Sequence, residues 1–176
     1  MSYVIAIDVG IKNLGLCVFD FKTAKVVYWD NVSLVHNGKY VPSLNVQYVM
    51  SMVAKLECYF ANAFQVIVER QMRCNMRIIE AILETMYYGK CLILSARSVK
   101  MHYGLSMKNY RLNKQKAVQW TKQFVTANPS AFADSALLNF SKASKQDDLA
   151  DCLLMCMYYL DTYSNQLTGG IPSYNV

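Results

Sequence analysis

The chain has 176 residues, enough for one domain to bury roughly two thirds of its unfolded surface without disulfide support. Although 54% of the residues are hydrophobic, the apolar stretch Cys152–Leu160 is far shorter than the ~20 residues that span a bilayer, which argues against a membrane protein. The net charge of +6 is concentrated, because residues 85–133 contain eight basic side chains and no carboxylate, and this pattern favours a polyanionic partner.

The first third of the chain predicts three strands and a helix. The apolar segments Val4–Val9, Leu14–Phe21 and Lys25–Trp29 are separated by short connections, which is typical of an antiparallel meander. Residues 31–43 contain Asn-Gly and Pro and are expected to form a hairpin or loop. Ser43 is then expected to cap a helix whose apolar stripe runs from Val46 to Phe60.

The middle of the chain adds two strands and a helix. Within Gln65–Arg70, three consecutive apolar residues indicate a strand that is covered on both faces. Cys74–Tyr88 predicts a helix whose apolar face is wider than one sheet would cover, so a second contact surface, such as a dimer interface, is expected there. With Leu92–Ala96 as a fifth strand, the order of elements predicts a mixed α/β sheet.

The last third is predicted to be mainly helical. Lys114–Val125 and Asp147–Tyr163 have helical patterns, and residues 126–146 resemble a loop with a short helical turn around Ala133–Phe140. We expect one domain over residues 1–163 and an irregular tail over 164–176.

Cysteine and histidine usage argues against a zinc site. The six cysteines form no Cys-x-x-Cys pair, and the chain has only two histidines. We interpret Cys152 and Cys156, which share an apolar helix face, as small buried residues in a reducing compartment. The start Met1-Ser2-Tyr3 leads directly into a strand and lacks the features of a secretory signal, so we expect an intracellular protein.

Two carboxylates stand at the ends of apolar strands. Asp8 follows Val4–Ile7, and Glu69 follows Val66–Val68. A lone charge in such a place is costly unless it is paired or bound to a metal. For Glu69 the alternative is a salt bridge with Arg70 or Arg73.

Two further carboxylates open the last helix. Asp148 and Asp151 are three residues apart, so both project from one face, and their repulsion is tolerable if a cation lies between them. The alternative is that Asp147 or Asp148 only caps the helix, and for Asp147 this is our prediction. Together the four acids predict a metal-dependent nuclease, since oxygen ligands suit Mg²⁺ or Mn²⁺.

Three segments carry a family resemblance: Ile5–Gly15, Val66–Gln71 and Lys145–Asp151. In order and spacing they resemble the Holliday junction resolvases of the RuvC type. The resemblance is stronger to the poxvirus members than to the fungal mitochondrial members. The resemblance covers roughly residues 3 to 160. It implies an RNase H-like fold, with a five-stranded mixed sheet flanked by helices, and a homodimer that cuts four-way DNA junctions by paired symmetric nicks.

The resemblance also implies roles for individual residues. Asp8, Glu69, Asp148 and Asp151 match the family's metal-binding residues. The family uses a lysine near the scissile phosphate; Lys114 fits this role better than Lys116, and Lys100 is a more distant candidate. No nucleotide cofactor is implied.

The expected mechanism follows from charge. Two Mg²⁺ ions ~3.5 to 4 Å apart, replaceable by Mn²⁺, would stabilise both the attacking and the leaving oxygen of the phosphodiester. On this hypothesis Asp8 bridges the ions, Glu69 and Asp148 complete the shell of one ion, and Asp151 holds the other and orients the water.

DNA is expected to be bound through its phosphates, so that the shape of a branched junction decides recognition. The basic residues predicted to contact DNA are Arg70, Arg73, Arg77, Arg97, Lys100, Lys108, Arg111, Lys114 and Lys116. Tyr88, Tyr103 and Tyr110 lie among these bases and are candidates for stacking on opened bases, with ordinary core or surface placement as the alternative. His102 is interpreted as a phosphate contact or a surface residue. For a viral protein, the location would be the cytoplasm of the infected cell.

Two other functions fit parts of the sequence. Asp8-Val9-Gly10 with Gly15 also resembles the first phosphate loop of actin-like and sugar-kinase ATPases, but the chain has no repeat of this motif for a second domain, and Asp148 and Asp151 would be unexplained. A non-catalytic DNA-binding module on the same scaffold would be expected to lack some of the four acids, and here all four are present.

Overall fold

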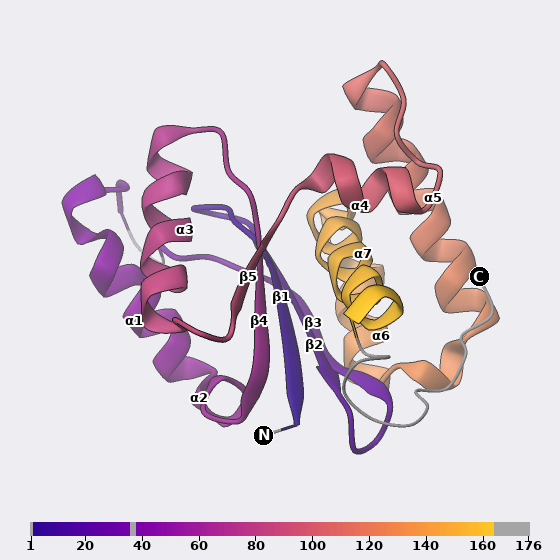
Figure 1. The fold of residues 1–176 in the computed structure, drawn as a ribbon, viewed down its shortest axis with the longest axis horizontal. Helices are drawn as coiled ribbons and strands as arrows, with labels where there is room; N and C mark the ends of the chain where they lie inside the picture. Colours follow the sequence, from indigo (N-terminus) through magenta and orange to yellow (C-terminus); the bar gives the residue numbers. More distant parts are fainter. Residues whose placement is uncertain (1, 36–37, 164–176) are drawn as a thin grey trace.

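The computed structural model describes residues 2–35 and 38–163, which form a central sheet between two layers of helices (Figure 1). The sheet has the strand order β3-β2-β1-β4-β5. The strands are β1 (Tyr3–Asp8), β2 (Leu14–Asp20), β3 (Lys25–Val32), β4 (Ala63–Glu69) and β5 (Cys91–Leu94). The first three strands are antiparallel, whereas β4 and β5 run parallel to β1, so the predicted mixed five-stranded sheet is confirmed.

One face of the sheet is covered by helices α1, α2 and α3 (Figure 1). These helices are α1 (Asn45–Lys55), α2 (Glu57–Phe60) and α3 (Cys74–Met86). The single helix that was predicted to reach Phe60 is wrong, because the backbone leaves helical geometry at Leu56. Ser43 is also not the cap: it lies in the 3₁₀ turn η1 (Pro42–Leu44), and Leu44 precedes α1 without a side-chain hydrogen bond.

The opposite face is covered by α4 to α7 (Figure 1). The elements are α4 (Ala96–His102), α5 (Tyr110–Ala127), the 3₁₀ turn η2 (Pro129–Ala131), α6 (Asp134–Lys142) and α7 (Gln146–Tyr163). Helix α4 was not predicted, α5 begins four residues earlier than expected, and α6 lies where a short helical turn was expected around Ala133–Phe140. Asn37 of the predicted hairpin and the predicted tail lie outside the described residues.

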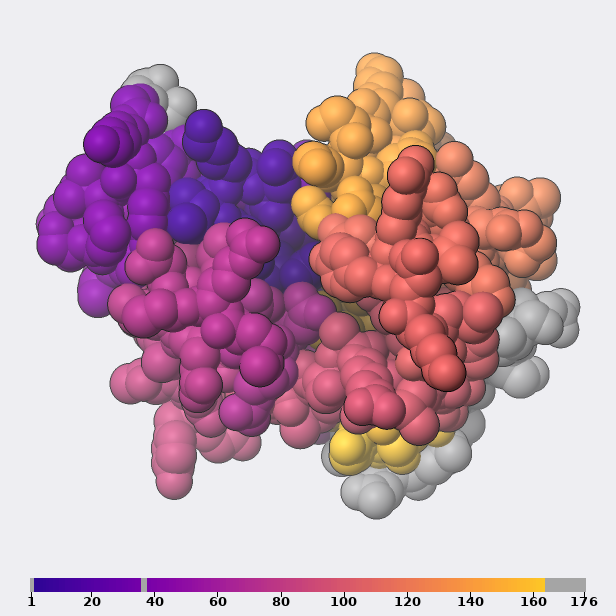
Figure 2. All heavy atoms as spheres, turned by 90° about the horizontal axis from the view of Figure 1, so that it is seen from above, coloured from indigo at the N-terminus to yellow at the C-terminus, as the bar shows by residue number. Residues whose placement is uncertain are grey.

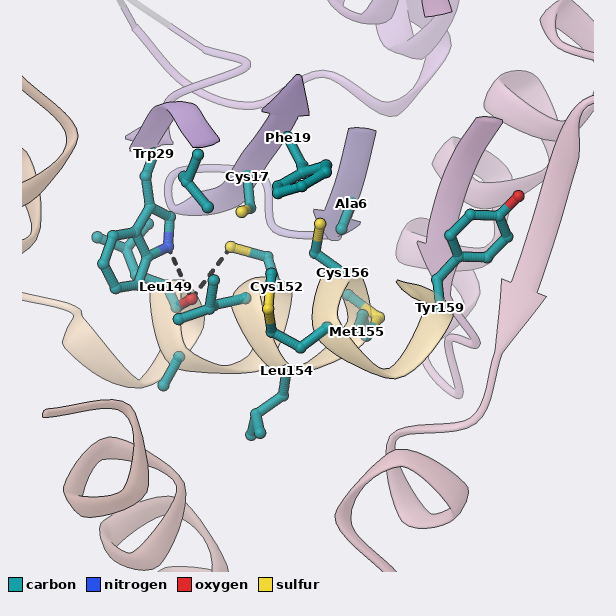
Figure 3. Close-up of a cluster of buried hydrophobic side chains, with 14 of the residues drawn as sticks. Ala6, Cys17, Phe19, Trp29, Leu149, Cys152, Leu154, Met155, Cys156 and Tyr159 are labelled. Carbon is teal, nitrogen blue, oxygen red and sulfur yellow. Dashed lines mark hydrogen bonds between the residues drawn. The ribbon is translucent and has the colours of Figure 1, made fainter. Parts of the chain in front are cut away.

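The core has two parts because β1 is buried on both faces. Val4 and Ala6 contact the cluster under α7, whereas Ile5 and Ile7 contact the cluster under α1 and α3. This two-sided burial explains the continuous apolar run. Figure 3 shows α7 lying against the sheet, with Cys152 and Cys156 directed toward Cys17.

The thiols fit the expected buried, reduced state. All six cysteines are free, and Cys17, Cys152 and Cys156 are buried. Burial raises the pKa of each of the Cys17 and Cys152 thiols well above its usual value, so both stay protonated. Within residues 2–35 and 38–163, no helix is long and apolar enough to cross a bilayer.

Candidate active site

The strand pleat directs Asp8 and Glu69 toward the same layer. Side chains alternate along a strand, and Ala6 and Ile67, two residues earlier in each case, contact the cluster under α7. Asp8 and Glu69 therefore face α7 from the ends of adjacent parallel strands. The protonated Asp8 carboxyl can donate a hydrogen bond to Glu69, which contributes to the raised pKa of Asp8.

Helix α7 brings Asp148 and Asp151 to these strand ends because it packs closely on β2. At Gly15, which pairs with Asp8, an added Cβ would lie 2.5 Å from the Asp148 carbonyl oxygen and 3.5 Å from the Asp8 Cβ. Only glycine leaves room for this approach. Two side chains of β3 also hold the start of α7: Trp29 Nε1 donates to Leu149 O at 2.9 Å, and Asn31 Nδ2 donates to Lys145 O at 3.1 Å.

The four carboxylates line one cleft of about 800 Å³. Figure 2 looks onto this edge of the sheet and shows the surface hollowed between the indigo-to-magenta part of the chain and the salmon-to-orange part. Lys100, Lys114 and Lys145 line the same cleft. The residues that were predicted from three distant segments are thus brought together.

Two lysines neutralise part of this acidic cluster. Lys100 Nζ lies 2.8 Å from Asp151 Oδ1 and 3.0 Å from Oδ2, and both side chains are about nine-tenths buried. Lys114 Nζ forms an ion pair with Asp147 and lies 3.7 Å from Asp148 Oδ1. Asp147, predicted to be only a helix cap, instead lies inside α7, which begins at Gln146, and is the partner of Lys114.

Burial and neighbouring charges shift the pKa values of several side chains in the cleft. Burial, the hydrogen bond with Glu69 and the repulsion of the other carboxylates raise the pKa of Asp8 well above its usual range. Burial raises the pKa of Asp151 against the opposing effect of Lys100, and burial with repulsion from Asp147 raises that of Asp148. Burial acts against ionisation of Asp147 and Lys114, yet their hydrogen bond dominates, lowering the Asp147 pKa and raising the Lys114 pKa.

The donor set is compatible with a hard divalent cation. The site offers carboxylate oxygens, and Asp8 is a buried acid whose charged form a cation would stabilise. In the part of the chain that the structure describes, no three acidic, cysteine or histidine side chains already form a metal-binding cluster. In this metal-free arrangement Lys100 pairs with Asp151, and Lys114 Nζ lies 3.7 Å from Asp148 Oδ1.

Glu69 does not form the salt bridge that was considered as an alternative. Arg70 pairs instead with the buried Glu80 of α3, with Nε 3.7 Å from Oε1. Glu80 also accepts from the Gln71 backbone N–H at 2.6 Å, and Gln71 Nε2 donates to Glu69 Oε2 at 3.1 Å. The turn after β4 is thus held so that Glu69 faces the cleft.

A sequence model of the poxvirus A22 protein family matches residues 2–162. The chain belongs to this family. No curated protein sequence matches it.

Solved structures share the fold of this A22-family chain at low sequence identity. The yeast mitochondrial Holliday junction resolvase Ydc2 is 20% identical with a TM-score of 0.67, covering 95% of this chain and 86% of its own. The fowlpox virus resolvase in complex with Holliday junction DNA is 18% identical with a TM-score of 0.67, covering 94% and 99%. Thermus thermophilus RuvC is 16% identical with a TM-score of 0.56, covering 90% and 95%. The predicted RNase H-like fold of the RuvC type is therefore confirmed.

The A22-family chain distributes its predicted DNA-binding bases around the cleft. Arg70, Arg73, Lys100 and Lys114 line the cleft itself. Arg97 and Lys108 line a neighbouring hollow beside α4, Arg111 lines another along α5, and Arg77 lies on α3. Lys116 lines none of these three hollows, and its ammonium contacts Met107 Sδ at 3.6 Å, whereas Lys114 lines the acidic cleft.

Sequence reasoning missed the residues that support the acids. Gly15, Trp29, Asn31 and Glu80 act through contacts between segments 9 to 133 positions apart in the chain. The spacing of Asp8 and Gly15 around a tight connection was the one available signal, since antiparallel pairing places them opposite each other. Lys145 was visible as part of the third motif but had been assigned no role.

Proposed function

We propose that the chain is a divalent-metal-dependent endonuclease that resolves four-way DNA junctions by paired symmetric nicks, with Mg²⁺ as its metal and Mn²⁺ as a substitute. The observation that carries this proposal is the convergence of Asp8, Glu69, Asp148 and Asp151 on one cleft bordered by basic residues. The similar structures support the substrate, because two are named as Holliday junction resolvases and one is a complex with junction DNA.

The position of each residue in the cleft indicates the role that it would have. Asp8 and Glu69 at the strand ends, with Asp148 and Asp151 on α7, would hold the metal ions. When bound, the metal would stabilise negative charge on the attacking and leaving oxygens of the phosphodiester. Lys114, which is partly exposed and already beside Asp148, would neutralise the phosphate. Lys100 is buried against Asp151 and would position that carboxylate.

The proposal is tested by incubating the protein with a synthetic four-arm DNA and with a linear duplex, in Mg²⁺, Mn²⁺ or EDTA. Ligatable nicks at symmetric positions on the junction alone, dependent on the metal, are expected. Cleavage of both DNAs at equal rates would reject junction selectivity, and cleavage in EDTA would reject the metal.

Single substitutions test the four acids. Asp8→Asn, Glu69→Gln, Asp148→Asn and Asp151→Asn should each lower the cleavage rate by about 10³-fold or more, since each removes charge that binds the metal, while junction binding in EDTA stays within a few fold. Glu57→Gln, an exposed acid of α2, is the matched control and should cleave normally. Full cleavage by any one of the four variants would remove that residue from the site.

Symmetric cutting requires two sites, and a face of α1 and α3 is suited to join two copies. A groove there is lined by Val46, Met50, Ile78, Ile82 and Met86. Four of these side chains are between 41% and 57% exposed: Val46, Met50, Ile78 and Met86. We propose a homodimer through this face. Light scattering should give a dimer mass at micromolar concentration, and Ile78→Glu should give a monomer; a monomeric wild-type protein would contradict the dimer.

The alternatives carry less support. Nucleotide binding by an actin-like or sugar-kinase-type domain leaves Asp148 and Asp151 without a role, and calorimetry showing bound ATP without DNA cleavage would favour it. A catalytically inactive DNA-binding module would bind junctions and never cut them. Within the proposed function, the natural substrates are branched intermediates of viral DNA replication and recombination, and the free thiols fit the reducing cytoplasm of an infected cell.

A further inference from the structure

The side chain of Tyr110, the first residue of α5, is prominently exposed where three hollows meet. It is 72% exposed. The first hollow is the acidic cleft, the second lies along α5 beside the start of α7, and the third lies between α4 and the start of α5. Among the described residues, Tyr110 alone borders all three.

The ring of Tyr110 is held in position from its own helix. Asn109 caps α5, with Oδ1 accepting from the backbone N–H groups of Arg111 at 2.9 Å and Leu112 at 3.3 Å. Lys114 Nζ, already tied to Asp147, lies 5.5 Å from the centroid of the Tyr110 ring. A cation at this distance attracts the ring. The exposed ring thus has a contact on its own helix beside the acidic cleft.

The two hollows that flank Tyr110 outside the cleft suit a polyanion. Arg111 and Lys122 line the one along α5, and Arg97 and Lys108 line the one beside α4. Asp147 is the one acid among the residues that line them, and Lys114 neutralises it. A flat aromatic ring between two hollows with basic lining residues matches two diverging phosphate backbones with a base exposed at their separation.

The other candidate tyrosines do not share this arrangement. Tyr103 donates to Asp161 at 2.6 Å and its ring packs 4.8 Å from that of Trp120, so it is already engaged. Tyr88 is 91% exposed but follows α3 and borders none of the three hollows. Tyr110 is thus the candidate that combines exposure, basic surroundings and proximity to the cleft.

We propose that Tyr110 is a nucleobase-stacking site that recognises the branch point of DNA. This inference rests on the proposed function and adds to it a means of choosing branched over linear DNA. The two strands that part at a junction would follow the two basic hollows, and Tyr110 would stack on a base that is unpaired where they separate. A linear duplex also offers phosphates, so a base exposed at the branch would add a contact that only branched DNA provides.

The test compares Tyr110→Ala, Tyr110→Phe and the control Tyr88→Ala in EDTA. Binding is measured to a four-arm DNA and to a linear duplex of equal length, and 2-aminopurine replaces a base at the branch. We expect Tyr110→Ala to weaken junction binding by roughly fivefold or more, with duplex binding unchanged. Tyr110→Phe and Tyr88→Ala should bind as the wild type does. The 2-aminopurine should fluoresce more brightly in the Tyr110→Ala complex than in the wild-type complex, since stacking quenches it.

Each other outcome is informative. Tyr110→Ala with unchanged junction preference and unchanged 2-aminopurine fluorescence would overturn the stacking site. Equal losses in Tyr110→Phe and Tyr110→Ala would also overturn it, since the hydroxyl rather than the ring face would then matter. A wild-type protein that neither prefers nor cuts the junction would reject the proposed function itself, whereas normal wild-type cleavage with an unaffected Tyr110→Ala rejects this inference alone.

Discussion

Ionisation of Asp8 destabilises the folded protein when no cation is present. Folding raises its pKa, so the folded protein binds this proton more tightly than the unfolded chain, in which an aspartate has a pKa of about 3.9. Below that pH the group causes no penalty, and as the pH rises above it the folded state loses stability until the folded pKa is passed.

Asp8→Asn should therefore stabilise the metal-free protein at neutral pH. In EDTA at pH 7.5 we expect a midpoint of thermal unfolding at least ~2 °C above that of the wild type, and the difference should shrink toward pH 4. Addition of Mg²⁺ should stabilise the wild type more than the variant. A lower midpoint for Asp8→Asn in EDTA at pH 7.5 would show that its charge is already compensated within the protein.

Lys100 and Asp151 form a buried pair in which each member depends on the other. Lys100→Met leaves the carboxylate without its counter-ion, so we expect the free energy of unfolding in EDTA to fall by ~3 kcal/mol. Asp151→Asn in the same chain should restore much of that loss, and urea unfolding of the double-mutant cycle measures the coupling. Lys116→Met, an exposed lysine of α5, is the control and should change stability by less than ~0.5 kcal/mol. Additive single effects would mean that the two residues do not interact.

At the scale of elements, the contact of β2 with α7 sets the position of two acids. Gly15→Ala would place a Cβ 2.5 Å from the Asp148 carbonyl oxygen, so α7 or β2 must move. We expect a loss of ~1–3 kcal/mol in the free energy of unfolding, measured by urea denaturation, and a fall in junction cleavage larger than that in junction binding. Normal cleavage by Gly15→Ala would show that the helix can shift without disturbing the site.

The strands were predictable from sequence because their signal is local. β1 and β4 are buried on both faces and give continuous apolar runs that end in Asp8 and Glu69. α4 was missed because a seven-residue helix with three basic or histidine side chains has little apolar periodicity. The start of α5 was placed late because its first residues, Tyr110 to Leu112, are exposed and do not continue the buried apolar face, and its signal was the Asn109 cap.

The identity of the four acids could be predicted from the sequence, but the lysines and other residues that contact them could not. The family resemblance and the strand ends indicated which carboxylates meet. The choice among Lys100, Lys114 and Lys116 required the packing of α4 and α5 against α7, which no pattern within a single segment encodes. The partners of the acids, such as Trp29 and Gly15, are likewise set by contacts distant in the chain.

At the scale of the whole molecule, the acid-free basic segment 85–133 places α4 and α5, with their lysines and arginines, on one side of the sheet. Arg111→Gln and Lys122→Gln should each weaken junction binding and reduce the slope of log Kd against log salt by about 1, as expected for one lost phosphate contact. Lys55→Gln, on α1 across the sheet, should leave the slope unchanged. Anisotropy titrations over a salt series measure all three, and an equal effect of Lys55→Gln would indicate non-local electrostatics.

Helix α7, the last described element, packs against β1, the first. During synthesis Asp8 leaves the ribosome more than 140 residues before Asp151. A nascent or prematurely terminated chain that ends before residue 146 lacks the helix that supplies half of the acids. The four acids can therefore meet only after residues 146–151 have been synthesised, and a shorter nascent chain would lack two of the four proposed metal ligands.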